Sequence, residues 1–183
     1  MAITITRAQV KAKDTFPTSD DSFVDTLISA VTTFVENYLK RTVEAAAYDE
    51  YYDGDGSLEI HTKQFPINSV SSLTHEDENG NTVYTWTSVD YAYESQGLIK
   101  LRKGKFPKGI QNIRIQYNAG YTTLPKDLED AVIDHILWKK ANRQGKDLGL
   151  RTKSLGDGGY QIYQMGIPDK IKIVYDLYRR FGT

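Results

Sequence analysis

Residues 110–132 read IQNIRIQYNAGYTTLPKDLEDAV and contain both kinds of secondary structure that the rest of the chain repeats. From Ile110 to Tyr117 apolar and polar residues alternate, which is the period of a strand with one buried face. After Pro125, a residue suited to the first turn of a helix, apolar residues recur at helical spacing, starting with Leu128 and Ala131. This change of period predicts an α+β fold.

The strand pattern extends from Ile110 towards the N-terminus and ends near residue 43. Over this region β-branched and aromatic residues alternate with polar ones between turn signals such as Asn79-Gly80, a pair that tolerates the positive φ of a tight hairpin. We expect seven strands, at residues 43–52, 57–62, 70–75, 82–86, 91–94, 98–102 and 110–117. The sequence therefore predicts an antiparallel β-rich insert over about residues 43–121.

Helical patterns flank this β region on both sides. Thr6 and Gln9 have the spacing of a capping box, and the apolar stripe from Phe23 to Leu39 is typical of a helix packed in a core. Helices are expected near residues 7–13, 23–40, 125–142 and 168–181, the last with Ile171, Val174, Leu177, Tyr178 and Phe181 on one side. We predict a single domain, residues 1–183, in which a small helical bundle (1–42 and 122–183) carries the β-rich insert (43–121).

The chain lacks the residue spacings that catalysis or cofactor binding requires. It contains no cysteine, and its three histidines, at positions 61, 75 and 135, are too far apart in sequence to form a metal-binding pair on one face. Acid pairs such as Asp49-Glu50 are more typical of solvated turns than of a glycosidase, which needs one carboxyl with a raised pKa. We expect no enzyme activity, no metal and no cofactor.

The apolar stretches of the chain are short. The stretch from Thr26 to Val35 is interrupted by three hydroxyl residues and falls far below the ~20 residues that cross a bilayer. The N-terminus has no basic segment followed by a continuous apolar one, so no secretory signal is predicted. We expect no membrane partner and a protein that stays where it is made.

Charge is distributed unevenly along the sequence although the net charge is only −1. Residues 44–99 hold one basic and eleven acidic side chains, whereas residues 100–183 hold seventeen basic and eight acidic ones. Folding can mix these segments into an evenly charged surface. Alternatively, it can leave acidic and basic poles, which favour head-to-tail contacts between identical copies and hence rings or filaments.

A basic run without acidic residues, which also includes Arg114, lies between positions 95 and 117. Phe106 and Tyr117 lie within this run, so these two aromatic rings are candidates to interleave with a polyanion. The alternative is a solvated hairpin, because one basic hairpin on a neutral protein gives weak phosphate affinity. The candidate polyanion contacts are Lys100, Arg102, Lys103, Lys105 and Lys108.

A stretch rich in glycine, lysine and polar residues separates the last two predicted helices, from Asn142 to Gly166. Loops of this length are rare inside a compact domain and are usually functional or ordered by a partner. We therefore interpret this stretch as a candidate contact segment.

The order of these elements resembles the head-tail connector (adaptor) family of tailed bacteriophages and prophages, in the long form with a β-rich insert. The segments that carry the resemblance fall in the family's order and span nearly the whole chain. They are VENYLKR (35–41), FPINSVSSL (65–73), YNAGY (117–121), LPKDLEDA (124–131), SLG (154–156) and LYRR (177–180).

This resemblance implies a structural virion protein without catalysis. Such a protein assembles as a ring under the portal, completes the DNA-filled head and offers the surface for tail attachment. The implied partners are further copies of itself in a portal-matched, dodecameric ring, the portal protein, the next neck or tail-completion protein, and DNA that passes without sequence specificity. The implied location is the virion neck, after synthesis and assembly in the cytoplasm of the bacterial host, and the isolated protein is compatible with a monomer.

The resemblance also assigns two contact regions. The subunit-interface or channel loop is expected to use Lys146, Arg151, Lys153, Ser154, Gly156, Tyr160 and Tyr163. Portal docking is expected at Tyr178, Arg179, Arg180 and Phe181. Two alternatives stay open: another phage neck or tail-completion protein, and an aromatic-rich β module that binds a polyanion or a carbohydrate.

Overall fold

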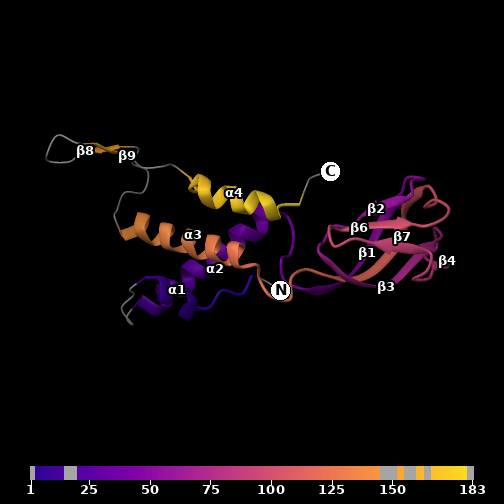
Figure 1. Ribbon diagram of the computed structural model, residues 1–183, viewed down its shortest axis with the longest axis horizontal. Helices are drawn as coiled ribbons and strands as arrows, with labels where there is room; N and C mark the ends of the chain where they lie inside the picture. Colours follow the sequence, from indigo (N-terminus) through magenta and orange to yellow (C-terminus); the bar gives the residue numbers. More distant parts are fainter. Residues whose placement is uncertain (1–2, 15–19, 145–151, 155–159, 163–165, 181–183) are drawn as a thin grey trace. The chain divides into compact units, whose positions relative to one another are not determined.

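The computed structural model describes residues 3–14, 20–144, 152–154, 160–162 and 166–180 of the chain (Figure 1). These residues contain helices and antiparallel sheets, which confirms the predicted α+β fold. The chain divides into two compact units. The β unit is Arg41–Thr123, and the helical unit combines Ala2–Lys40 with Leu124–Thr183. The predicted one-domain organisation stays a prediction.

The described residues of the helical unit form four helices, α1 (Arg7–Lys13), α2 (Asp21–Leu39), α3 (Lys126–Gln144) and α4 (Asp169–Tyr178). The predicted capping box is present, since the Gln9 amide donates to the Thr6 hydroxyl and the Thr6 amide donates to the Gln9 side chain. Helix α2 packs against α1, α3 and α4. Its fully buried residues follow the predicted stripe, at Leu27, Val31, Val35 and Leu39.

The β unit contains seven strands in two antiparallel sheets. The larger sheet has the order β1-β7-β3-β4, and the smaller one has the order β2-β6-β5. The strands are β1 (Ala46–Gly54), β2 (Glu59–His61), β3 (Ile67–Glu76), β4 (Thr82–Trp86), β5 (Tyr91–Tyr93), β6 (Leu98–Leu101) and β7 (Gly109–Ala119). All seven predicted strands are therefore confirmed, with ends that shift by a few residues.

The core of the β unit combines residues from both sheets. Strand β7 alternates as the sequence predicts: Ile113, Ile115 and Tyr117 are buried, whereas Arg114 and Gln116 on the other face are only half-buried. The smaller sheet contributes Ile60, Ile99 and Tyr91 to the same cluster. Each sheet therefore covers the apolar face of the other, and the larger sheet keeps a polar outer face.

The chain enters and leaves the β unit through two segments that lie next to each other. The Ala45 amide donates to the Tyr121 carbonyl at 3.0 Å, and the Tyr121 amide donates to the Val43 carbonyl at 2.8 Å. Gly120, with φ of 110°, allows this approach, because a Cβ there would lie 2.5 Å from the Glu44 carbonyl oxygen. The two chain segments that lead into and out of the β unit are thus hydrogen-bonded neighbours.

Three details differ from the sequence-based expectations. Helix α4 ends at Tyr178 rather than near residue 181, because Arg179 has extended backbone angles. Its buried face contains Ile171 and Tyr175, so placing Leu177 on that face was wrong. The stretch from residue 142 to 166 also includes two short strands, β8 (Thr152–Ser154) and β9 (Tyr160–Ile162), which form an antiparallel pair.

Candidate functional site

The exposed face of α4 is the first candidate interaction surface. Ile173 and Leu177 keep 63% and 69% of their surface accessible, and their separation of four residues places them on one side of the helix. The opposite side packs inward through Tyr175, whose hydroxyl lies 3.2 Å from Nδ1 of the buried His135. The large Tyr175 ring thus sets the rotation of the helix, and two aliphatic side chains remain outside.

The predicted portal-docking residues mainly hold α4 in place. The Tyr178 hydroxyl donates to the Asp127 carboxylate, with distances of 2.7 and 2.8 Å to its two oxygens. The Arg179 guanidinium lies 5.5 Å from the centre of the Tyr38 ring, and the Arg180 amide donates to the Leu39 carbonyl at 3.0 Å. Phe181 lies outside the described residues.

The sequence did not predict that Ile173 and Leu177 would form an exposed surface of α4. Their four-residue spacing was visible, but Ile171 has the same relation to Tyr175, and both pairs satisfy a helical stripe. Only the burial of one pair against α3 and α2 distinguishes them. A lone amphipathic helix with two apolar stripes does not specify which stripe packs.

The predicted interface loop is described only in part. Lys146, Arg151, Gly156 and Tyr163 lie outside the described residues. Lys153 and Ser154 are positions of β8, and Tyr160 is a position of β9, with Ser154 opposite Tyr160 in the register. The backbone therefore brings these three positions into one hairpin.

The predicted polyanion contacts do not act as one group. Lys100 is paired with Glu59, and the Arg102 side chain donates to the Tyr91 carbonyl at 3.4 Å. The remaining three, Lys103, Lys105 and Lys108, are exposed in the loop between β6 and β7. This loop is the basic loop (Arg102–Lys108).

Aromatic interleaving with a polyanion was wrong for both rings proposed. Phe106 is 1% exposed and packs edge-on against Trp86, with ring centres 5.3 Å apart. Tyr117 is 2% exposed on the inner face of β7. Stacking on bases needs an accessible ring face, so the loop offers cations alone.

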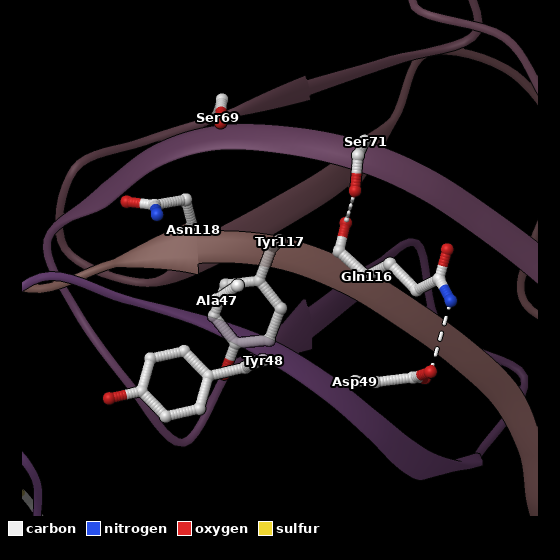
Figure 2. A pocket seen from close by; sticks show the side chains of 8 residues that line it. All are labelled: Ala47, Tyr48, Asp49, Ser69, Ser71, Gln116, Tyr117 and Asn118. Atoms are coloured by element: carbon white, nitrogen blue, oxygen red, sulfur yellow. Dashed lines mark hydrogen bonds between the residues drawn. The ribbon is translucent and has the colours of Figure 1, made fainter.

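A shallow groove crosses the outer face of the larger sheet, over β1, β7 and β3 (Figure 2). Its lining residues are Ala47, Tyr48, Asp49, Ser69, Ser71, Gln116, Tyr117 and Asn118. In Figure 2 the Ser71 hydroxyl donates to the Gln116 carbonyl, and the Gln116 amide donates to Asp49 at 3.0 Å. Much of the polar lining is therefore occupied by internal hydrogen bonds.

Arg114 fixes the charges on this outer face. It donates to both Asp49 oxygens, at 2.8 and 2.6 Å, and to the buried Glu76 at 3.3 Å. The hydrogen bonds from Arg114, followed by that from Gln116, lower the pKa of Asp49 to about 2. The Tyr51 hydroxyl completes the network by donating to Glu76 at 3.1 Å. This arrangement stabilises the sheet and keeps the Asp49 carboxylate ionised at neutral pH.

Asp49 and Glu50 point to opposite faces of β1. On the inner face Glu50 accepts hydrogen bonds from the hydroxyls of Tyr52 and Tyr117, the latter at 2.7 Å. Burial raises the pKa of both tyrosines, which keeps them protonated as donors. Neighbours on a strand cannot act on one bond from the same side, so this acid pair does not form a glycosidase site.

Among the described residues, no three His, Cys, Asp or Glu side chains gather as a metal site. Within the same residues, none of the helices combines the length and the apolar character needed to span a membrane.

Comparison with known proteins identifies the family. A family model described as HCP, head completion protein, matches residues 3–181. This chain belongs to the head completion protein family. The resemblance to phage head-tail connectors found in the sequence is thereby confirmed, and with it a structural role in completing the head. None of the curated proteins matches the chain in sequence.

Solved structures share the fold of this head completion protein over its whole length. One similar chain belongs to the neck of an empty gene transfer agent (GTA) particle computed with C6 symmetry, with a TM-score of 0.60 and 13% identity. Another belongs to the neck of a native GTA particle computed with C12 symmetry, with a TM-score of 0.56 and 14% identity. Each alignment covers 100% of this chain and 97% of the other. Both units of the present chain are thus part of the shared fold.

Proposed function

We propose that this head completion protein assembles as a ring in the neck of a phage-like virion, joins the portal to the tail, and performs no catalysis. The observation that carries the proposal is the family match over residues 3–181. It is supported by similar chains in GTA necks that were computed with C6 and C12 symmetry. Rings of this kind need contact surfaces on each subunit rather than a reactive centre.

The exposed strip of α4 is our candidate for portal docking. Ile173 and Leu177 form an apolar pair at the surface. Burying two such side chains in a partner's groove contributes about 3 to 5 kcal/mol before the costs of association. This proposal replaces Tyr178 and Arg179 as the main docking residues, because these two contact Asp127 and Tyr38 within the subunit.

The loop between α3 and α4 is our candidate for contact with a neighbouring subunit or with DNA in the channel. Two-stranded hairpins such as β8–β9 are marginally stable alone, which favours a role completed by a partner. The basic positions Lys146, Arg151 and Lys153 suit the backbone of DNA without reading its sequence. Deletion of residues 144–163 should then abolish assembly, and unchanged assembly would rule this role out.

The main experiment measures mass by light scattering, for the purified protein alone and mixed with the portal ring of the same genome. We expect the protein to move quantitatively into the portal peak. The variant Ile173→Ser with Leu177→Ser should lose this association by at least tenfold, while thermal unfolding stays unchanged because both side chains are already exposed. Lys172→Ser, on the same exposed helix, is the matched control and should bind normally.

A wild-type protein that ignores the portal at low and moderate salt would contradict the proposal. Binding to tail proteins would then favour another neck or tail-completion role. Binding to nucleic acid that weakens steeply with salt would instead favour the polyanion alternative.

A further inference from the structure

Strand β4 is an uncharged strand at the edge of the larger sheet. Its sequence Thr82-Val83-Tyr84-Thr85-Trp86 contains neither a charge nor a proline. Its pairing with β3 is bulged at Val83, since His75 pairs with Tyr84 and Glu76 pairs with Thr82. Val83 and Tyr84 are 58% and 52% exposed. The bulge hinders backbone pairing with another strand, so these two exposed side chains indicate a surface that side chains of another chain cover.

The stretch of sequence that contains β4 carries one sign of charge. Residues 64–99, from before β3 to after β5, contain no lysine or arginine. The turn before β4 is acidic: the Asp77 carboxylate accepts from the amides of Asn79 and Asn81, while Glu78 is exposed. Within the described residues Glu78 forms no ion pair. We call Glu78 with Val83 and Tyr84 the β4 patch.

The basic loop has the complementary character. Lys103 and Lys105 are exposed and form no ion pair within the described part of the chain, and Lys108 lies over Gly56. Two residues beyond Lys108, Ile110 is 86% exposed, which makes it the most exposed large apolar side chain among those described. Each of the two surfaces thus combines exposed apolar groups with charge, and the signs of the charge are opposite.

The basic loop runs between β4 and β1. Its first residue lies beside the turn that follows β4, because the Arg102 amide donates to the Asp90 carbonyl at 2.8 Å. Its Phe106 ring packs on Trp86 of β4, with ring centres 5.3 Å apart. The end of the loop lies beside the last residue of β1, because Pro107 approaches Gly54 so closely that a Cβ on Gly54 would meet its carbonyl. Glu78, Lys103 and Lys105 are exposed, so a single copy presents both surfaces outward.

We propose that in the assembled ring the β4 patch of one copy receives the basic loop and Ile110 of the adjacent copy. This proposal rests on the proposed ring function and names the contact between its β units. Val83, Tyr84 and Ile110 form the apolar centre of the interface. Glu78 and the lysines Lys103 and Lys105 form a charged rim, which fixes the orientation and disfavours pairing of two β4 strands by like-charge repulsion.

The test uses thiol cross-linking, because the chain contains no native cysteine. The double variant Glu78→Cys with Lys105→Cys is assembled on the portal ring, treated with a short bifunctional thiol reagent, and separated on a denaturing gel. We expect a ladder of linked chains, since each copy contacts two neighbours. Each single variant should stay monomeric on the gel. The control Glu94→Cys with Lys105→Cys should give no ladder, because Glu94 lies in the turn near the start of β3, away from the β4 patch.

A charge exchange tests the same contact without cysteines. Glu78→Lys or Lys105→Glu alone should reduce ring formation at least tenfold in low salt, and the combination of both should restore it. Rings of normal mass without a ladder and without rescue would overturn this interface but keep the ring function. Dimers of Glu78→Cys alone would show two β4 strands pairing and would also overturn it. Failure of the wild type to join the portal would overturn both proposals.

Discussion

The β unit and the helical unit are built from the chain in opposite ways. The β unit is one continuous stretch, Arg41–Thr123, whereas the helical unit combines the two ends of the chain. Polar contacts in the helical unit accordingly join residues far apart in sequence, such as Gln9 with Glu129 and Lys140 with Asp14. Those on the outer face of the β unit stay within it, as Arg114 shows with Asp49.

This difference shows how a β-rich insert can be accommodated in a helical subunit. The segments at Val43–Ala45 and at Tyr121 are hydrogen-bonded to each other, so the β unit leaves the helical path and returns to it at neighbouring points. An insertion whose ends are close imposes little constraint on the surrounding fold. We therefore expect each unit to keep its own core, and the following substitutions test that separation.

The largest effects are expected from cavities in the two cores. Leu27 of α2 and Ile115 of β7 are both fully buried, so truncation to alanine should cost about 2 to 5 kcal/mol in either case. Leu27→Ala should speed hydrogen exchange in the helices, and Ile115→Ala should do so in β1, β3 and β7. Equal acceleration in both units after either substitution would disprove separate cores.

Removing the cation of an ion pair should cost less stability than a core cavity, and the cost should differ between the two units. Arg114→Met leaves the buried Glu76 without its cation and should cost about 2 kcal/mol. The matched control Lys13→Met removes an exposed pair with Asp130 and should cost much less, because water already solvates both charges. Urea denaturation measures both. Similar losses would mean that the polar outer face of the sheet is no more important than an ordinary surface pair.

The smallest expected effect is a change in the pH dependence of stability, and it arises from His135 in the helical core. Burial, aided by the charge of Lys139, lowers the pKa of this histidine to about 4, so the folded state keeps it neutral. The unfolded chain binds a proton below pH 6.5, and stability should therefore fall as the pH decreases from 6.5 towards 4. Between pH 7.5 and 5.5 this contribution amounts to about 1 kcal/mol.

His135→Gln should remove this part of the pH dependence of the free energy of unfolding. The control His61→Gln, at an exposed position of β2, should leave the free energy of unfolding at pH 7 unchanged. An unaltered profile for His135→Gln would show that the histidine does not titrate on unfolding as its burial implies.

Much of the fold was predictable because its signals are local. The alternation in residues 110–117, the Asn79-Gly80 turn and the Thr6/Gln9 capping box each depend on neighbours in sequence, and all three are found in the structure. The family was also predictable, since its short segments keep their order along nearly the whole chain. The sites were less predictable. Phe106 and Leu177 were assigned to the wrong side, because hydrophobicity alone does not say which partner buries a side chain.

The sequence by itself determined the class of elements, their order and the family to which this head completion protein belongs. These follow from periodicity, turn residues and caps, which act over a few residues. Only the tertiary structure decided that Tyr175 rather than Leu177 turns inward, that Lys100 is paired with Glu59, and that β4 ends its sheet uncovered. Pairings between distant segments fix these outcomes, and the surfaces available to a partner are those that such pairings leave exposed.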